Sequence, residues 1–293
     1  MRFRILGSPE LYDDVRHRHI PLNAPKQRLL LGALLSHPNR TVPRETLVRE
    51  LWGGTPPRKS ASTLNAHVSL LRKALLEVEP ERANAPRLVA RGSGYLLEAA
   101  PEETDFGRFG QALDRTRRTA ALDPENACTA LREALGLWRG TVLEGGAHGP
   151  LCAELTARLE EERQQALELL FDCALRAGLH RYIVPELEEV TAAHPRRERF
   201  HDQLMEALCG CGREADAIGV YHRARRHLPA EADRTPLLTA RLARIGARSL
   251  VPPAPDARPR EAVRPEADHE SVHSVFGYLA ELLSGQVLLS PRV

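Results

Sequence analysis

The sequence of 293 residues is poor in several residue types, with only three lysines, two methionines, two tryptophans and 4% aromatic side chains. It contains no GxxxxGK[ST], GxSxG or GxGxxG motif. Hydrolysis of ATP and the other chemistries tied to these motifs are therefore not indicated. Scattered Ser, His and Asp residues without such a frame do not indicate a catalytic triad. We expect no enzyme activity and no cofactor.

Long apolar runs are also missing, since no stretch approaches the roughly 18 residues that suggest a membrane span. The opening MRFRILG is too short and too charged for the apolar core of a signal peptide. The five cysteines are odd in number and lie in segments that are predicted to be helical. We therefore expect a cytoplasmic protein with no membrane association.

A metal site is an alternative role for two of the five cysteines. Cys209 and Cys211 have His201 and His222 nearby in the sequence, but the chain has no CxxC pair and the two cysteines fall where helices are expected to pack. We expect no bound metal.

The charge is divided unevenly along the chain. Residues 1–98 hold 16 Lys and Arg against 9 Asp and Glu, a net charge of +7, whereas residues 99–250 hold 21 against 24, a net charge of −3. A basic first third joined to a mildly acidic remainder is typical of a module that binds a polyanion and is attached to a module that contacts proteins.

Residues 1–98 show the pattern of a small α+β domain. RFRILG at 2–7 alternates with Phe3 and Ile5 on one face, which predicts a half-buried strand. Helical spacing of leucines predicts a helix from Lys26 to the His37-Pro38-Asn39 segment. A second helix is predicted to have Pro43 in its first turn and to end at Trp52-Gly53-Gly54.

The segment 60–77, SASTLNAHVSLLRKALLE, predicts a third helix with two different faces. Its core face is predicted to consist of Leu64, Val68, Leu71 and Leu75, which recur at helical spacing. The opposite face carries short polar and cationic side chains that can meet base edges and phosphates. The following LVARGSGYLLE predicts a hairpin with a tight tip at 91–94, from which Arg91 can approach a phosphate or a minor groove.

This order of strands, three helices and a hairpin predicts a winged helix-turn-helix. The phrases LVRELWG, STLNAHVSLLRKAL and ARGSGYLL closely resemble the effector-domain pattern of the OmpR/PhoB-type winged helices of two-component regulators. The resemblance implies that the third helix is the recognition helix. The predicted DNA-binding residues are Trp52, Lys59, Ser62, Thr63, Asn65, Ala66, His67, Ser69, Leu70, Arg72, Lys73, Arg91 and Ser93.

Simpler interpretations of single residues stay open beside this one. A cationic helix face is commonly only a solvated face, Trp52 alone more often belongs to a core, and His67 alone is more often a neutral surface or capping histidine. Two positions that are often cationic in the family are Ser69 and Leu70 here, and Leu70 can instead meet a thymine methyl group. The operator sequence is therefore not transferable from relatives.

Residues 101–250 are predicted to be all-α. Amphipathic segments are separated at Asp123-Pro124, at GGAHGP, at Gly178, at His194-Pro195 and at Pro229. Gly178 and Gly212 lie 34 residues apart, as do Pro195 and Pro229, and Leu170 and Leu204. Thirty-four residues is the period of tetratricopeptide helix hairpins, although two hairpins of similar length also share a spacing by chance. Ala215 and Tyr221 fit the positions at which such helices pack closely.

Four phrases extend the resemblance: DFGRFGQAL, LREALGLWRGTVL, LEEERQQALELLFDCALRAG and HPRRERFHDQLMEALCGCGREADAIGVYHRAR. They resemble the bacterial transcriptional activation domain, and with the winged helix they place residues 1–250 close to the Streptomyces antibiotic regulatory protein family. The resemblance implies an activator that binds direct repeats in promoters of a secondary-metabolite cluster and recruits RNA polymerase holoenzyme with its sigma factor. Side-by-side binding to direct repeats suits a homodimer on DNA.

The sequence thus predicts an α-rich multidomain protein: a winged helix-turn-helix (1–98), then a tetratricopeptide-like all-α domain (101–250). A Pro-rich linker (251–268) and an amphipathic helix (269–293) are expected to follow. The loop HLPAEADRTPLL lacks the glycine-containing turn common in relatives, so the last helix of the second domain can be placed differently. The alternative function is a tetratricopeptide-type adaptor whose basic head binds an acidic protein.

Overall fold

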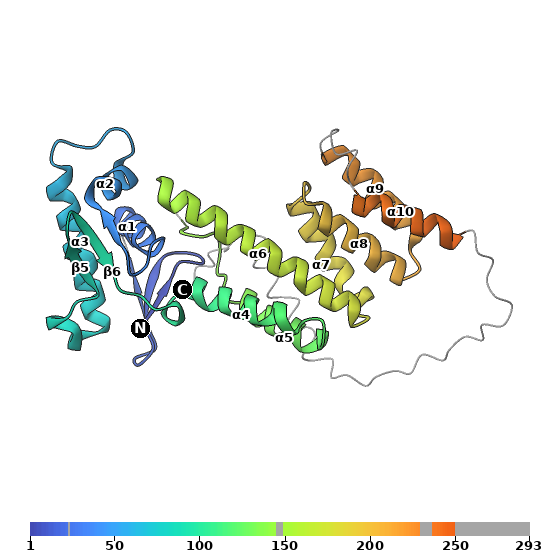
Figure 1. The fold of residues 1–293 in the computed structure, drawn as a ribbon, viewed down its shortest axis with the longest axis horizontal. Helices are drawn as coiled ribbons and strands as arrows, with labels where there is room; N and C mark the ends of the chain where they lie inside the picture. The colour runs from blue at the N-terminus through green and yellow to red at the C-terminus, as the bar shows by residue number, and fades with distance from the viewer. Residues whose placement is uncertain (23, 145–148, 229–235, 250–293) are drawn as a thin grey trace, which may run out of the picture. The chain divides into compact units, whose positions relative to one another are not determined.

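The computed structural model describes residues 1–22, 24–144, 149–228 and 236–249 of the chain (Figure 1). The predicted linker at 251–268, the predicted helix at 269–293 and the break at Pro229 lie outside these residues. The described chain forms two compact units, one made of residues 1–118 and 130–166 and the other of residues 119–129 and the chain from 167 onward.

Two small antiparallel sheets open the first unit. One has the order β1-β2-β3 and the other the order β4-β6-β5. Their strands are β1 (Arg2–Arg4), β2 (Glu10–Asp13), β3 (Arg18–Pro21), β4 (Thr41–Pro43), β5 (Leu88–Arg91) and β6 (Gly94–Leu97). As predicted, Phe3 and Ile5 are fully buried. Strands β5 and β6 form the predicted hairpin, and β4 adds a third strand to it that the sequence pattern did not predict.

Three helices pack beside these sheets: α1 (Pro25–Leu35), α2 (Arg44–Trp52) and α3 (Ser60–Val78). Helix α2 ends as predicted at Gly53, whose φ of +64° favours glycine. The prediction for Pro43 was wrong, because Pro43 ends β4 and precedes the helix with an extended φ/ψ of −60° and 145°. Strands, three helices and a Gly-tipped hairpin constitute a winged helix-turn-helix.

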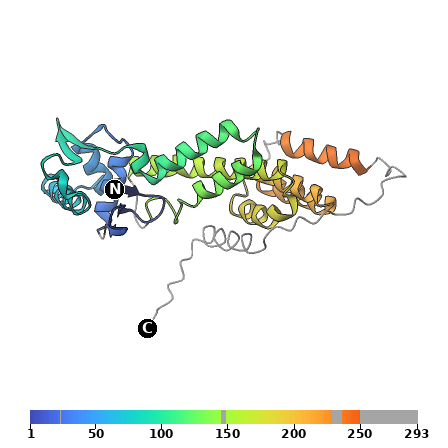
Figure 2. The ribbon, with the colours of Figure 1, turned by 90° about the horizontal axis from the view of Figure 1, so that it is seen from below.

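The first unit continues through short turns η1 (Pro80–Asn84) and η2 (Pro101–Glu103) into helices of the all-α region. Helix α4 (Asp105–Thr119) lies beside the first part of α6 (Pro150–Arg176), and Arg117 of α4 donates a hydrogen bond to Gln165 of α6 (Figure 2). Helix α5 (Pro124–Leu135) lies between α4 and α6 in the sequence, and both α5 and α6 contribute residues to each of the two units. Phe109 and Trp138 form an edge-to-face pair at 5.5 Å in this core.

Two buried carboxylates join these helices to the winged helix within the first unit. Glu50 of α2 accepts hydrogen bonds from the backbone N–H groups of Leu151 and Cys152, both at 2.9 Å, and thereby caps the start of α6. Asp105, at the start of α4, accepts hydrogen bonds from the N–H groups of Ile5 and Leu6. Burial raises the pKa of Asp105. The start of each helix is therefore fixed to a different part of the winged helix.

The second unit contains α7 (His180–Ala193), α8 (Glu198–Gly210), α9 (Glu214–His227) and α10 (Pro236–Ser249). The predicted repeat is visible in its turns, since Gly178 and Gly212 have φ values of +74° and +72°. Leu170 and Leu204 are both buried, as their shared interval predicts. The prediction for Ala215 was wrong: this residue is exposed, and Ala217 is the small residue that packs inward. In its described residues the region is tetratricopeptide-like and all-α.

Candidate nucleic-acid interface

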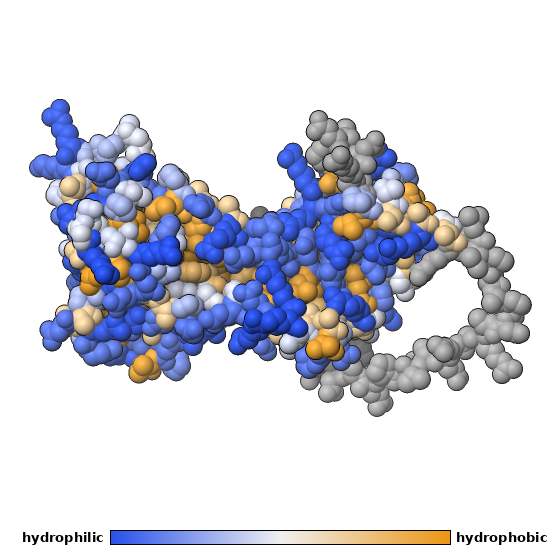
Figure 3. All heavy atoms as spheres, viewed as in Figure 1, coloured by the Kyte–Doolittle hydropathy of each residue, from blue (hydrophilic) through white to orange (hydrophobic). Residues whose placement is uncertain are grey.

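Helix α3 separates a core face from an outward face, as the sequence predicts. Leu64, Val68, Leu71 and Leu75 are at most 5% exposed. The outward side chains that are exposed are Ser62, Asn65, Ala66, Ser69, Leu70 and Lys73, with Leu70 49% exposed. Figure 3 shows hydrophilic and intermediate side chains mixed with some hydrophobic ones over the part of the first unit where α3 lies in Figure 1. The four aliphatic residues hold this ridge in a fixed orientation.

Two of the predicted contact residues are tied to the hairpin. The Tyr95 hydroxyl donates a 2.7 Å hydrogen bond to Oδ1 of Asn65, and Nε of Arg72 donates one of 2.8 Å to the carbonyl oxygen of Leu88. The guanidinium of Arg72 also lies 6.0 Å from the Tyr95 ring centre. The β5–β6 hairpin, which is the wing of the winged helix, thus positions these two side chains of α3. Only the remaining polar groups of Asn65 and Arg72 are left for an external ligand.

The first turn of α3 turns its hydroxyl groups toward its own backbone. Ser62 Oγ and Thr63 Oγ1 both donate to the carbonyl oxygen of Lys59, at 2.9 and 3.0 Å. Their oxygens can still accept a hydrogen bond. The side chain of Lys59 is exposed just before the helix.

His67 and Trp52 lie in a packed cluster rather than on the exposed ridge. Their ring centres are 6.3 Å apart, and Lys26 Nζ lies 4.7 Å from the Trp52 ring while donating to the carbonyl oxygen of Leu51. Nδ1 of His67 is buried and makes no hydrogen bond to a described residue. Burial, and secondly the charge of Lys26, lower the pKa of His67. This geometry favours a neutral packing histidine, and DNA contacts from these two residues stay predictions.

The hairpin tip places Arg91 and Ser93 at an exposed edge. Gly92 has a φ of +56°, and a Cβ on Gly94 would lie 2.1 Å from the carbonyl oxygen of Val42, so only glycine permits β4 to approach there. Arg91 and Ser93 are exposed on either side of Gly92. The wing can therefore present a cation and a hydroxyl to a backbone phosphate.

Arg44 is a candidate that the sequence reasoning missed. It is exposed at the start of α2, its N–H donates to the carbonyl oxygen of Ser93, and its guanidinium lies 5.2 Å from the ring centre of Tyr95. Because Tyr95 also holds Asn65, this cation lies beside the outward face of α3. The only signal in the sequence was a lone arginine after Pro43, which no motif distinguishes.

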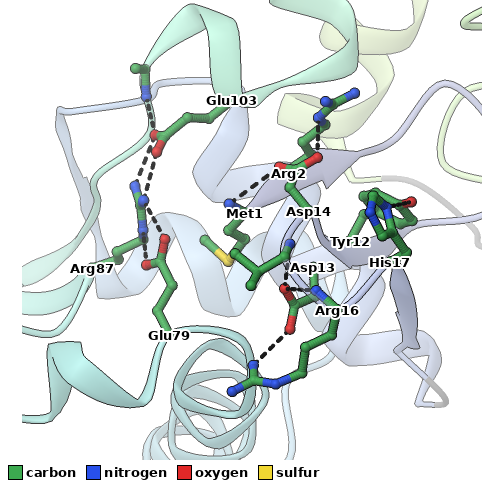
Figure 4. A network of polar contacts seen from close by, with 12 residues as sticks. Met1, Arg2, Tyr12, Asp13, Asp14, Arg16, His17, Glu79, Arg87 and Glu103 are labelled. Atoms are coloured by element: carbon green, nitrogen blue, oxygen red, sulfur yellow. Dashed lines mark hydrogen bonds and ion pairs between the residues drawn. The ribbon is translucent and has the colours of Figure 1, made fainter.

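Arg87 is a cation of this region that is committed to internal partners. It is 7% exposed and forms paired hydrogen bonds of 2.6–2.8 Å with both Glu79 and Glu103 (Figure 4). The hydrogen bonds that Arg87 donates to Glu79 lower the pKa of Glu79 and raise that of Arg87. The network fastens the end of α3 to β5 and to η2, so Arg87 stabilises the interface without lining it.

Comparisons with known proteins agree with this architecture. Residues 18–97 match the family model described as "Transcriptional regulatory protein, C terminal", and residues 104–245 match "Bacterial transcriptional activator domain". The chain is 35% identical over 268 residues to the transcriptional regulator RedD of Streptomyces coelicolor, covering 90% of this chain and 76% of that protein. It is 32% identical to the regulatory protein DnrI of Streptomyces peucetius, covering 70% and 77%.

Two further relatives are longer proteins. Identity to the regulatory protein AfsR of Streptomyces coelicolor is 37% over 235 residues, which cover 79% of this chain but only 22% of AfsR. The solved structure of Mycobacterium tuberculosis EmbR in complex with a low-affinity phosphopeptide superposes with a TM-score of 0.75 at 27% identity, covering 95% of this chain and 70% of that one. Among the helices that the structure describes, none has the length and apolar character needed to cross a membrane.

Proposed function

The chain belongs to the Streptomyces antibiotic regulatory protein family of transcriptional regulators, which are not enzymes, and from this membership we propose a promoter-specific mode of action. In this proposal α3 enters the major groove of direct repeats upstream of secondary-metabolite genes. The helical region then recruits RNA polymerase holoenzyme through its sigma factor. The protein acts in the cytoplasm, where promoter DNA and polymerase are found.

The observation that carries the proposal is the exposed ridge of α3 above a fully buried aliphatic face. Ser62, Asn65, Ala66, Ser69 and Leu70 have the size and polarity to approach base edges, and the half-exposed Leu70 suits a thymine methyl group. Lys59, Lys73 and Arg91 are exposed cations around that ridge and suit phosphates. Arg44 joins this set from the start of α2.

Long-range electrostatics support the same proposal. Residues 1–98 carry a net charge of +7, which favours association with a polyanion of any sequence. Sequence preference must then come from the short side chains of the ridge, because phosphate contacts carry no base information.

Direct repeats require two copies of α3 to face the same way along the duplex. Two chains bound about one helical turn apart meet this requirement if they touch each other side by side, which is the basis for a homodimer on DNA. The buried carboxylates of Glu50 and Asp105 support transmission of this placement to α6 and α4, since their four backbone hydrogen bonds hold the starts of these helices to the winged helix.

A mobility-shift titration with promoter and scrambled DNA at several salt concentrations tests the proposal. Ala66→Glu places a carboxylate on the exposed ridge and should weaken promoter binding by roughly tenfold or more through repulsion of phosphates. The same substitution at Ala243, exposed on α10, is the matched control and should leave binding unchanged. Equal affinity for promoter and scrambled DNA would instead favour the adaptor that binds an acidic protein. A footprint on the intergenic DNA beside the gene would locate the repeats.

A further inference from the structure

A hollow of about 520 Å³ lies between α7, α8 and α9, entirely within the second unit. We call it the α7–α9 pocket. Its walls include the apolar residues Ala192, Pro195, Leu204 and Val220. Its volume falls in the range of roughly 300–1,000 Å³ that is typical of pockets for small molecules, and apolar walls with few polar groups are typical of them too.

Two polar side chains that line the pocket are buried and incompletely bonded. His201 is 4% exposed and Thr191 is 8% exposed. His201 Nε2 lies 3.0 Å from the carbonyl oxygen of Pro195, and because a carbonyl only accepts, Nε2 carries the proton. Burial lowers the pKa of His201, so the ring is neutral and Nδ1 is an acceptor. Neither Nδ1 of His201 nor Oγ1 of Thr191 finds a hydrogen-bond partner among the described residues.

The guanidinium of Arg223 lies at the mouth of the pocket on the side of α9. Arg223 and His227 line the pocket and are exposed, whereas Glu188 lines it from α7. Both α9 side chains lie near enough to His201 to help lower its pKa. Within the part of the chain that the structure describes, Arg223 forms no ion pair. An anionic group at the mouth would therefore find an uncommitted guanidinium.

We propose that the α7–α9 pocket binds a small apolar organic acid that also carries a hydroxyl or N–H donor. The carboxylate pairs with Arg223 at the mouth and the apolar body lies between Leu204 and Val220. The donor reaches Nδ1 of His201, which is covered in the unliganded protein, as the side chains around it move aside. Such a ligand bridges α8 and α9 and stabilises the second unit. The inference goes beyond promoter binding, and its test requires no DNA.

The test is calorimetric titration of the full-length protein with para-hydroxyphenylacetate, which combines a carboxylate, an apolar ring and a donor. A ligand of this size should bind with a Kd on the order of 1 mM or tighter. Phenylacetate lacks the donor and para-hydroxyphenylacetamide lacks the charge, and each should bind roughly tenfold more weakly. Absence of saturable binding, or equal binding of all three compounds, would overturn the proposal.

Matched variants locate the binding. Ala192→Trp fills the pocket, whereas Ala193→Trp places the same bulk on the exposed neighbouring residue that does not line it. Arg223→Gln removes the charge at the mouth, and Arg226→Gln removes an exposed charge one turn away. Only the first variant of each pair should lose affinity, by roughly tenfold. Equal losses within a pair would refute the assigned site. Promoter binding by the same preparations is scored separately, so failure of one proposal leaves the other intact.

Discussion

The phenol of Tyr95 on β6 donates a 2.7 Å hydrogen bond to Oδ1 of Asn65 on α3, joining the wing to the exposed ridge. The bond leaves the Asn65 amide nitrogen to act as a donor toward a base acceptor. The orientation of a proposed base-reading side chain is thus set by a residue outside the recognition helix.

Tyr95→Phe should relax base preference while keeping the fold. The ring is 4% exposed and is retained, so only the hydroxyl and its hydrogen bond are lost, at a cost of about 1 kcal/mol. Selection of binding sites from a randomised operator should show reduced discrimination at one position, similar to that of Asn65→Ala. Identical preferences in wild type and Tyr95→Phe would show that the bond has no part in readout.

Lys73→Ala and Arg72→Ala should separate phosphate contact from wing support. Removal of either cation should lower the slope of log affinity against log salt by about 1, weakening binding to all sequences alike. Arg72→Ala should also lower the thermal midpoint, since it breaks the bond to Leu88. Lys73 is exposed, and its removal should leave the midpoint unchanged. Arg158→Ala, an exposed cation on α6, is the control for both measurements. Unchanged slopes would place phosphate binding on another surface.

The main elements of this fold were predictable because they rest on local periodicity. The spacing of Leu64, Val68 and Leu71 defines the core face of α3 without any tertiary information, and Gly178 and Gly212 mark turns by their own backbone preference. Strand β4 was not predictable, since three residues ending in Pro43 are too few to establish an alternation and pair only once the hairpin is present.

The roles of individual side chains depended on partners distant in sequence. Asn65 and Tyr95 are 30 residues apart, and Glu50 meets the start of α6 about a hundred residues later, so each looks like an ordinary surface residue in the sequence. His67 shares the polar pattern of its neighbours but packs against Trp52. Periodicity assigns a side chain to a face, whereas its bonds are fixed by the assembled domain.

Glu79→Gln should reduce the loss of stability on acidification. The pKa of Glu79 is held below its usual value of 4.5 mainly by the hydrogen bonds from Arg87. A carboxyl with a lowered pKa in the folded state binds fewer protons there than in the unfolded state, so its stabilising contribution is present above pH 4.5 and is lost as the pH falls below it. Urea unfolding measured at several pH values across this window should show that the free energy of unfolding falls less steeply with falling pH in Glu79→Gln than in the wild type. If the free energy of unfolding of the two proteins depends on pH in the same way, Glu79 does not make this contribution to stability.

Glu50→Gln tests whether the cap on α6 stabilises the first unit. The carboxylate is 3% exposed and accepts two backbone N–H groups through two different oxygens. The amide retains the shape but offers only one acceptor, so one N–H faces an NH₂ group and is left without a partner. The expected loss is about 1–3 kcal/mol in the free energy of unfolding. Urea denaturation should report it as a lower midpoint with an unchanged slope. Glu45→Gln, an exposed change in the first turn of α2, is the control, and it should lower the free energy of unfolding by only a few tenths of the loss expected for Glu50→Gln. If both variants unfold at the same urea concentration, the cap contributes no more than a surface charge.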